Sequence, residues 1–156
     1  MNEQTGVIAR FSVAHDSVQQ AAHMLGLTHR VRVYVRRYEW LGGRYIALVD
    51  GEHRIGVASD LSAREASRAL WHELTHARQV EQLGGAEEFS TRWWREMSEL
   101  GLTRVEAALA DSRRYRSAPL EAEAKVGERN HRRLSLARPV RRRRLWPERK
   151  QGRLRP

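Results

Sequence analysis

The chain has 156 residues and no cysteine, which excludes disulfide bonds and thiolate metal sites. Its net charge of +10 is unevenly spread, because residues 129–156 hold twelve Arg or Lys and one acidic residue (+11), which leaves −1 for residues 1–128. No segment approaches the roughly 18 apolar residues of a membrane span, and the first residues lack a signal-peptide pattern. We therefore expect a cytoplasmic protein that does not cross a membrane.

The patterns in the first 60 residues predict one helix and a few short strands. In chain order these are a strand at 7–11, a helix at about 17–25, a strand at about 30–36, and a hairpin with strands at 45–49 and 54–57. Asp16 is the predicted N-cap of the first helix. Asp50-Gly51 lies between two apolar runs, which is a strong signal for a hairpin turn.

Helices are predicted for most of the remaining chain. Ser62 followed by Glu65 matches a capping box, so a helix begins there and continues to Gly84-Gly85. Further helices are expected at about 86–100, 103–114 and 119–134, the last opened by Pro119. Strands that precede helices indicate an α+β fold with a small antiparallel sheet. We expect one domain over 1–135 and a flexible, arginine-rich tail over 136–156.

The helix predicted after Ser62 contains the sequence H-E-x-x-H at residues 72–76. His72 and His76 are four residues apart and share one helix face, so both imidazoles can reach one metal ion. Glu73 lies near the same ion and can handle the proton of a water molecule. The alternative is an amphipathic helix with two surface histidines, since such a motif arises by chance in roughly one chain in fifty of this length.

The segment 72–79, with P-L-E-A-E-A at 119–124, resembles the zincin-like metallopeptidases. More narrowly it is similar to small gluzincin-type proteins of bacteria and phages, over about residues 60–125. The resemblance implies a zincin-like fold, one bound Zn²⁺, and hydrolysis of a polypeptide substrate. It also implies that Glu73 is the general base, which takes a proton from the attacking water and returns one to the leaving amine.

A catalytic zinc site has three protein ligands, so a third is needed beside the two histidines. Gln82 occupies the position of the third histidine in metzincins, which excludes that class. The resemblance implies Glu121 as the third ligand, with Glu123 and His131 as weaker candidates. Lys125 replaces the aspartate that supports a ligand histidine in many gluzincin-type families. Both glutamates can also be first-turn residues that complement the helix dipole.

Two further features bear on function. Tyr115, shortly before the helix of Glu121, is the candidate donor to the oxyanion of the reaction, although a packed core tyrosine is an equal alternative. The basic segment 129–156, with Trp146 among its arginines, can bind nucleic acid or another polyanion non-specifically, or it can be a solvated tail without a partner.

The predicted function is therefore zinc-dependent peptide hydrolysis, with His72, His76 and Glu121 as metal ligands and Glu73 and Tyr115 as catalytic residues. A hairpin directly before the motif helix supports this interpretation, because an edge strand beside a metal can hold an extended peptide by strand addition. The alternative is a nucleic-acid-binding protein on a catalytically inactive scaffold of the same kind.

Overall fold

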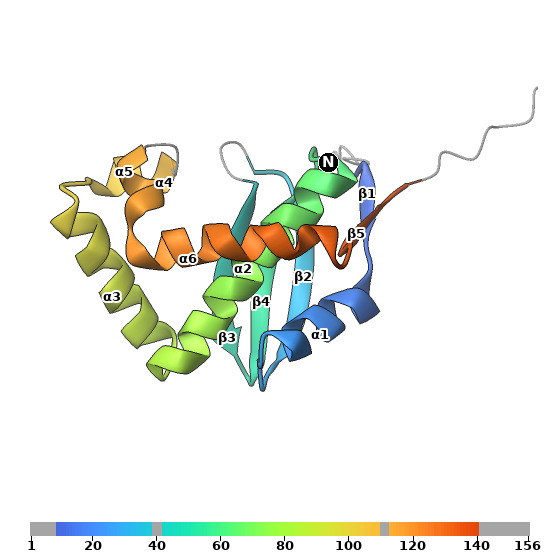
Figure 1. The fold of residues 1–156 in the computed structure, drawn as a ribbon, viewed down its shortest axis with the longest axis horizontal. Coiled ribbons are helices and arrows are strands. Elements are labelled where there is room, and N and C mark those ends of the chain that lie inside the picture. The colour runs from blue at the N-terminus through green and yellow to red at the C-terminus, as the bar shows by residue number, and fades with distance from the viewer. Residues whose placement is uncertain (1–8, 39–41, 110–112, 141–156) are drawn as a thin grey trace, which may run out of the picture.

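The computed structural model describes residues 9–38, 42–109 and 113–140 (Figure 1). It contains both helices and strands, as the sequence predicts. In chain order the elements are β1 Phe11–Val13, α1 His15–Met24, β2 Arg30–Arg36, β3 Gly43–Val49, β4 Glu52–Ala58, α2 Ala63–Leu83, α3 Ala86–Glu99, α4 Arg104–Leu109, α5 Arg113–Ser117, α6 Pro119–Gly127, the 3-10 helix η1 Glu128–Arg132, and β5 Ala137–Pro139. None of these helices is long and apolar enough to cross a membrane.

The larger sheet has three strands in the order β2-β4-β3. β3 and β4 form the predicted antiparallel hairpin, and Asp50 and Gly51 at its turn have φ values of 52° and 71°, as a tight hairpin turn requires. The prediction of a purely antiparallel sheet is wrong, because β2 runs parallel to β4. After β2 the chain skips the central position and forms β3 at the opposite edge of the sheet. The hairpin then returns the chain as β4, which lies between β3 and β2 and runs in the same direction as β2.

Helix α2 is the central element, and its ends are those that the sequence predicts. Ser62 Oγ accepts a hydrogen bond from the Glu65 N–H, and the Ser62 N–H donates to Glu65 Oε2 over 2.8 Å. Gly84 ends the helix with a left-handed φ of 95°. The capping box and the glycine stop therefore fix which 21 residues are helical, and with them the position of residues 72–76.

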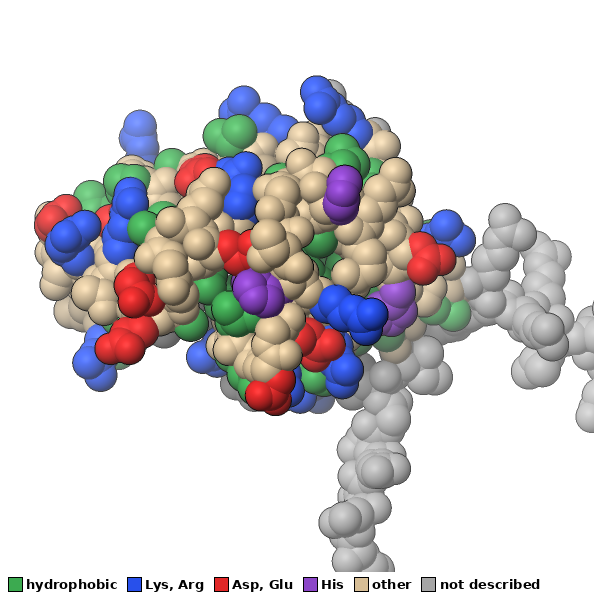
Figure 2. All heavy atoms as spheres, turned by 90° about the horizontal axis from the view of Figure 1, so that it is seen from below, with side chains coloured by type: hydrophobic (Ala, Val, Ile, Leu, Met, Phe, Trp, Pro, Cys, Tyr) green, Lys and Arg blue, Asp and Glu red, His purple; other side chains and the backbone are tan. Residues whose placement is uncertain are grey.

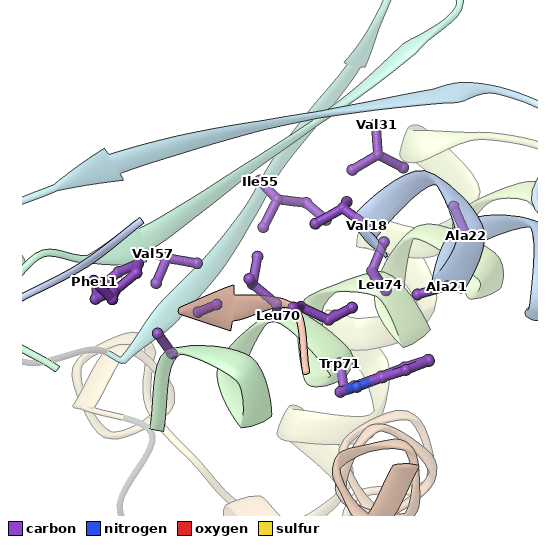
Figure 3. Close-up of a cluster of buried hydrophobic side chains, with 13 residues drawn as sticks. Phe11, Val18, Ala21, Ala22, Val31, Ile55, Val57, Leu70, Trp71 and Leu74 are labelled. Atoms are coloured by element: carbon purple, nitrogen blue, oxygen red, sulfur yellow. The ribbon is translucent and has the colours of Figure 1, made fainter. Parts of the chain in front are cut away.

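The main core lies where α1 and α2 pack against one face of the three-stranded sheet (Figure 3). Leu70 and Leu74 of α2 are fully buried, together with Val18 of α1 and Ile55 of β4. Trp71 on the adjacent side of α2 is also buried, and its indole N–H donates to the Leu134 carbonyl over 3.1 Å. This packing holds α2 rigidly across the sheet.

Several predicted element ends differ from the observed ones. Helix α1 begins at His15, with Ala14 as an N-cap that makes no side-chain hydrogen bond, so Asp16 lies in the first turn instead of capping it. The first strand lies later than predicted, at 11–13, and residues 1–8 are outside the described part. The helix predicted over 103–114 ends at Leu109, and the last helix ends at Gly127 and continues as a 3-10 turn.

The fold also includes residues that the sequence assigns to the tail. β5 pairs antiparallel with β1, and Ala137 lies opposite Val13. Leu136 is fully buried, and its N–H donates to Ser67 Oγ over 3.0 Å. The predicted boundary after residue 135 therefore falls inside the fold, because two apolar residues between arginines give no strand signal without their partner β1. Residues 141–156, including Trp146, are outside the described part.

Replacing Leu136 with alanine is expected to lower the free energy of unfolding by about 2–5 kcal/mol, because it leaves a cavity in the core. Val126→Ala is the control, since Val126 is 57% exposed and its truncation leaves no cavity. Urea unfolding followed by circular dichroism measures both variants. Equal stability of Leu136→Ala and the wild type would show that residues 136–140 do not contribute to the fold.

Candidate metal centre

Three side chains from two helices meet at one point beside the sheet. His72 and His76 come from α2, and Glu121 comes from α6, which packs across α2 in Figure 1. The two Nε2 atoms are 3.1 Å apart, and the Glu121 oxygens lie 3.2 Å from His72 Nε2 and 3.4 Å from His76 Nε2. Ligands in a tetrahedral zinc site are about 3.3 Å apart, given bonds of roughly 2.0–2.1 Å. The three donors therefore fit around one ion.

The Glu121 carboxylate gives an independent sign that an ion belongs here. Glu121 is only 2% exposed, and its Oε1 accepts a hydrogen bond from the Trp93 indole over 2.8 Å. Its Oε2 is buried and makes no hydrogen bond of ordinary geometry with the described residues. A buried carboxylate oxygen that lies 3.2 Å from His72 Nε2 but makes no well-aligned hydrogen bond is costly. A cation between the three side chains would satisfy it.

Each histidine is held from behind by an oxygen. His72 Nδ1 lies 3.1 Å from Glu128 Oε1, and His76 Nδ1 lies 2.8 Å from Gln79 Oε1. Such contacts fix the ring orientation and leave Nε2 free to face a metal. Lys125, which replaces the expected aspartate, donates to both oxygens of Glu128 and so holds that carboxylate in place. Support of the histidine therefore comes from a residue that the sequence analysis did not select.

The sequence contains a signal for only one of these two supporting residues. Gln79 is three positions after His76 on the same helix, a spacing at which side chains meet. Glu128 lies in η1, and nothing in the sequence indicates that the chain turns back to His72 there.

The charges around His72, His76 and Glu121 would favour a cation between them. Burial lowers the pKa of His72, but the carboxylates of Glu121 and Glu128 outweigh this effect and raise the pKa to about 10. Burial raises the pKa of Glu121, but the adjacent imidazoles of His72 and His76 hold it well below its usual range. The same carboxylate charge that favours a proton on His72 would favour a bound metal ion.

Glu128→Gln is expected to weaken metal binding about ten- to a hundredfold, because the amide keeps the shape of the side chain and loses the negative charge behind His72. Glu87→Gln, an exposed change of the same type on α3, is expected to leave the affinity unchanged. Competition with a chromogenic chelator measures the dissociation constant of each variant. Equal affinities would mean that Glu128 does not support the ligand histidine.

Glu73 lies against the hairpin at the edge of the metal centre. It is 6% exposed, and burial raises the pKa of its carboxyl group. A Cβ at Gly43 of β3 would lie only 3.0 Å from Glu73 Oε1, so glycine at this position permits the close approach. The backbone N–H of Tyr45 also donates a hydrogen bond to this carboxylate. Strand β3 thus holds Glu73 beside the two histidines.

The predicted catalytic tyrosine also reaches this site. Tyr115 of α5 lies next to Glu121, and burial and that carboxylate together raise the pKa of its hydroxyl above the usual range. Its hydroxyl therefore stays protonated at neutral pH and can donate a hydrogen bond. The ring centres of Trp93 and Tyr115 are 6.2 Å apart in an edge-on arrangement.

A cavity of about 820 Å³ opens onto the metal centre. Its walls come from β3, α2, α3, α5 and α6, and they include the five residues that the sequence analysis selected: His72, Glu73, His76, Tyr115 and Glu121. The cavity is large enough to hold several side chains of an extended peptide.

The other candidates for the third ligand are not at the metal centre. Glu123 faces away from the histidines, where it accepts a hydrogen bond from Gln79 Nε2 over 2.9 Å and pairs with Arg78. The side chain of His131 lies outside the described residues. Glu121 is therefore the carboxylate that α6 brings to His72 and His76.

A second group of the same composition, His29, His53 and Glu81, lies near the C-terminal end of α2. Glu81 Oε1 is 2.9 Å from a ring nitrogen of each histidine, and its two oxygens also accept the backbone N–H groups of Thr28 and His29. Burial raises the pKa of Glu81, but these donors lower it to about 2. Its hydrogen bonds join α2 to His53 of the sheet. Because both oxygens of Glu81 are already hydrogen-bonded, the group lacks the unsatisfied oxygen seen at Glu121.

No family model, curated protein or solved structure matches this chain. A proposal about function therefore has to be based on the residues and the geometry of the site.

Proposed function

We propose that this protein is a zinc-dependent metallopeptidase. The proposal depends mainly on one observation, the convergence of His72 Nε2, His76 Nε2 and the partly unsatisfied Glu121 carboxylate at 3.1–3.4 Å from one another on the wall of an open cavity. Glu73 and Tyr115 line the same cavity, which supports hydrolysis as its function.

The donor set favours zinc and a catalytic role. Two imidazoles and one carboxylate are ligands that zinc accepts, and three protein ligands leave one coordination position open, as catalytic zinc sites do. A structural zinc site would have four protein ligands. Zn²⁺ held here would supply a Lewis acid that polarises the substrate carbonyl and favours ionisation of water.

The remaining chemistry belongs to side chains of the chain itself. Glu73 accepts the proton of the attacking water on its carboxylate and later delivers a proton to the leaving amine. Its raised pKa brings it closer to neutral pH, where a group can do both. The protonated hydroxyl of Tyr115 donates a hydrogen bond to the oxygen that becomes negatively charged when the carbonyl is attacked.

The position of β3 supports a peptide as the substrate. Within the described sheet, β3 pairs with β4 alone, so its other edge faces no described strand. Residues 43–46 of this strand, and Gly42 before it, line the same cavity as the candidate metal centre. An extended peptide that pairs with β3 would pass directly over Glu73, with its side chains directed alternately into the cavity and away from it.

Zinc content and cleavage of a large mixed peptide library, followed by mass spectrometry, test the proposal. We expect one zinc per chain and a set of cleaved bonds that disappears with a chelator and returns with added zinc. A single test protein is a weaker assay, because a selective enzyme can leave it intact. A protein that holds no zinc after reconstitution, or that holds zinc and cleaves no peptide, would overturn the proposal.

A further inference from the structure

The face of the three-stranded sheet that lies away from α1 and α2 has a composition of its own. Residues on β2 alternate, so Val31 and Val33 face the helices while the residues between them face outward. The register places outward residues of neighbouring strands side by side. We call this outward surface the arginine face; it comprises Arg30, Arg32, Tyr34 and Arg36 of β2, Glu52, Arg54 and Gly56 of β4, Arg44 of β3, and Tyr38.

The arginine face is strongly basic on a body that is otherwise close to neutral. It has five arginines and one acidic residue, Glu52, a formal charge of +4, whereas residues 1–128 together carry −1. Arg30, Arg36 and Arg44 are exposed. Another surface of the molecule, seen from below in Figure 2, shows acidic and basic side chains interspersed. A charge concentrated on one face is typical of a surface that binds a polyanion.

Two arginines of this face have notable surroundings. Arg32 Nε lies 2.9 Å from Glu52 Oε1, and Glu52 is the one acidic residue of the arginine face. Arg54, beside Arg32 on the central strand, has a buried Nε that makes no hydrogen bond with the described residues. The guanidinium of Arg54 therefore retains a donor that local partners leave unused.

Two tyrosines lie among the arginines. The guanidinium of Arg36 is 5.1 Å from the ring centre of Tyr34, so a planar cation and an aromatic ring are adjacent. Tyr38 folds back over Gly56 in the next strand, and any side chain at Gly56 would overlap its hydroxyl. Aromatic rings on a flat sheet that also has arginines can stack on exposed bases, which a duplex does not offer.

We propose that the arginine face binds single-stranded nucleic acid. Phosphates would pair with the exposed arginines of β2, which together with Tyr34 occupy alternate positions about 6.7 Å apart, and bases would stack on the tyrosines. The proposal does not depend on the candidate metal centre, because Arg30, Arg32 and Arg36 lie on β2 while that centre lies beside β3. Arg44 is the one residue of the arginine face that also lines the cavity. Binding is sequence-tolerant and strongly dependent on salt.

The test compares two neutralising double variants of the full chain, so that residues 141–156 contribute equally to both. Arg30→Ser with Arg36→Ser alters the face, and Arg64→Ser with Arg95→Ser removes two exposed arginines from α2 and α3. Fluorescence anisotropy with a labelled 20-nucleotide dT strand gives the affinity at several salt concentrations. Circular dichroism verifies the fold of each variant.

The face variant is expected to bind more weakly than the wild type, with a log–log salt slope reduced by about 1.4 for the two lost phosphate contacts. The control variant is expected to keep the wild-type slope. Tyr34→Leu, which changes no charge, is expected to weaken binding by roughly fivefold or more through lost stacking. Equal slopes in the two double variants with an unchanged affinity in Tyr34→Leu would overturn the proposal. It would also be overturned if the face variant bound the dT strand as the wild type does and lost binding only to anionic vesicles or to duplex DNA.

Discussion

Glu73→Gln is expected to reduce peptide hydrolysis by about 10²–10⁴-fold while the protein keeps its zinc. Glutamine has nearly the same shape as glutamate and can still accept the Tyr45 N–H, but it cannot take a proton from water. The rate of cleavage of the best library peptide, together with zinc content, measures the effect. A loss of activity at constant zinc content separates the general base from the ligands.

Glu99→Gln on α3 is the matched control, since its side chain is exposed and far along the chain from the motif. It is expected to have wild-type activity. Residual activity of Glu73→Gln within tenfold of the wild type would mean that another group moves the proton, and the assignment of Glu73 would have to be abandoned.

Glu121→Ala is expected to abolish stable zinc binding, whereas Glu81→Ala is expected to preserve it. The two glutamates belong to clusters of identical composition, and only Glu121 has an unsatisfied buried oxygen. At a zinc concentration of 100 times the dissociation constant, zinc stabilises a protein that binds it in the folded state by about 2.7 kcal/mol. We expect this gain in the wild type and in Glu81→Ala, and we expect it to vanish in Glu121→Ala.

Glu81→Ala should nevertheless be less stable than the wild type without metal, by about 1–3 kcal/mol, because the fully buried His53 and the Thr28 N–H lose their acceptor. Thermal unfolding with and without zinc measures both effects. Loss of the zinc-dependent gain in Glu81→Ala, with retention in Glu121→Ala, would place the metal at the group of His29, His53 and Glu81.

The local features of the site could be predicted because they depend on neighbours in sequence. The capping box at Ser62 and the stop at Gly84 define α2, and helical geometry then puts His72 and His76 on one face. Asp50-Gly51 defines the hairpin in the same way, since few residues accept positive φ at both turn positions.

Contacts between distant segments could not be predicted with the same certainty. Glu121 and Glu123 have similar sequence surroundings, and only the packing of α6 across α2 directs the first to the histidines and the second to Arg78. The support of His72 by Glu128 requires that α6 be followed by a tight 3-10 turn. Both depend on the relative placement of helices, which no local pattern encodes.

The sequence by itself therefore determined the α2 helix, the pair of histidines with Glu73, and the hairpin beside them, because backbone propensity and hydrogen bonds over three or four residues set all of these. Only the tertiary structure decided which glutamate lies beside the two histidines, the parallel alignment of β2, and the pairing of β5 with β1, because each depends on burial against a segment far away in the chain.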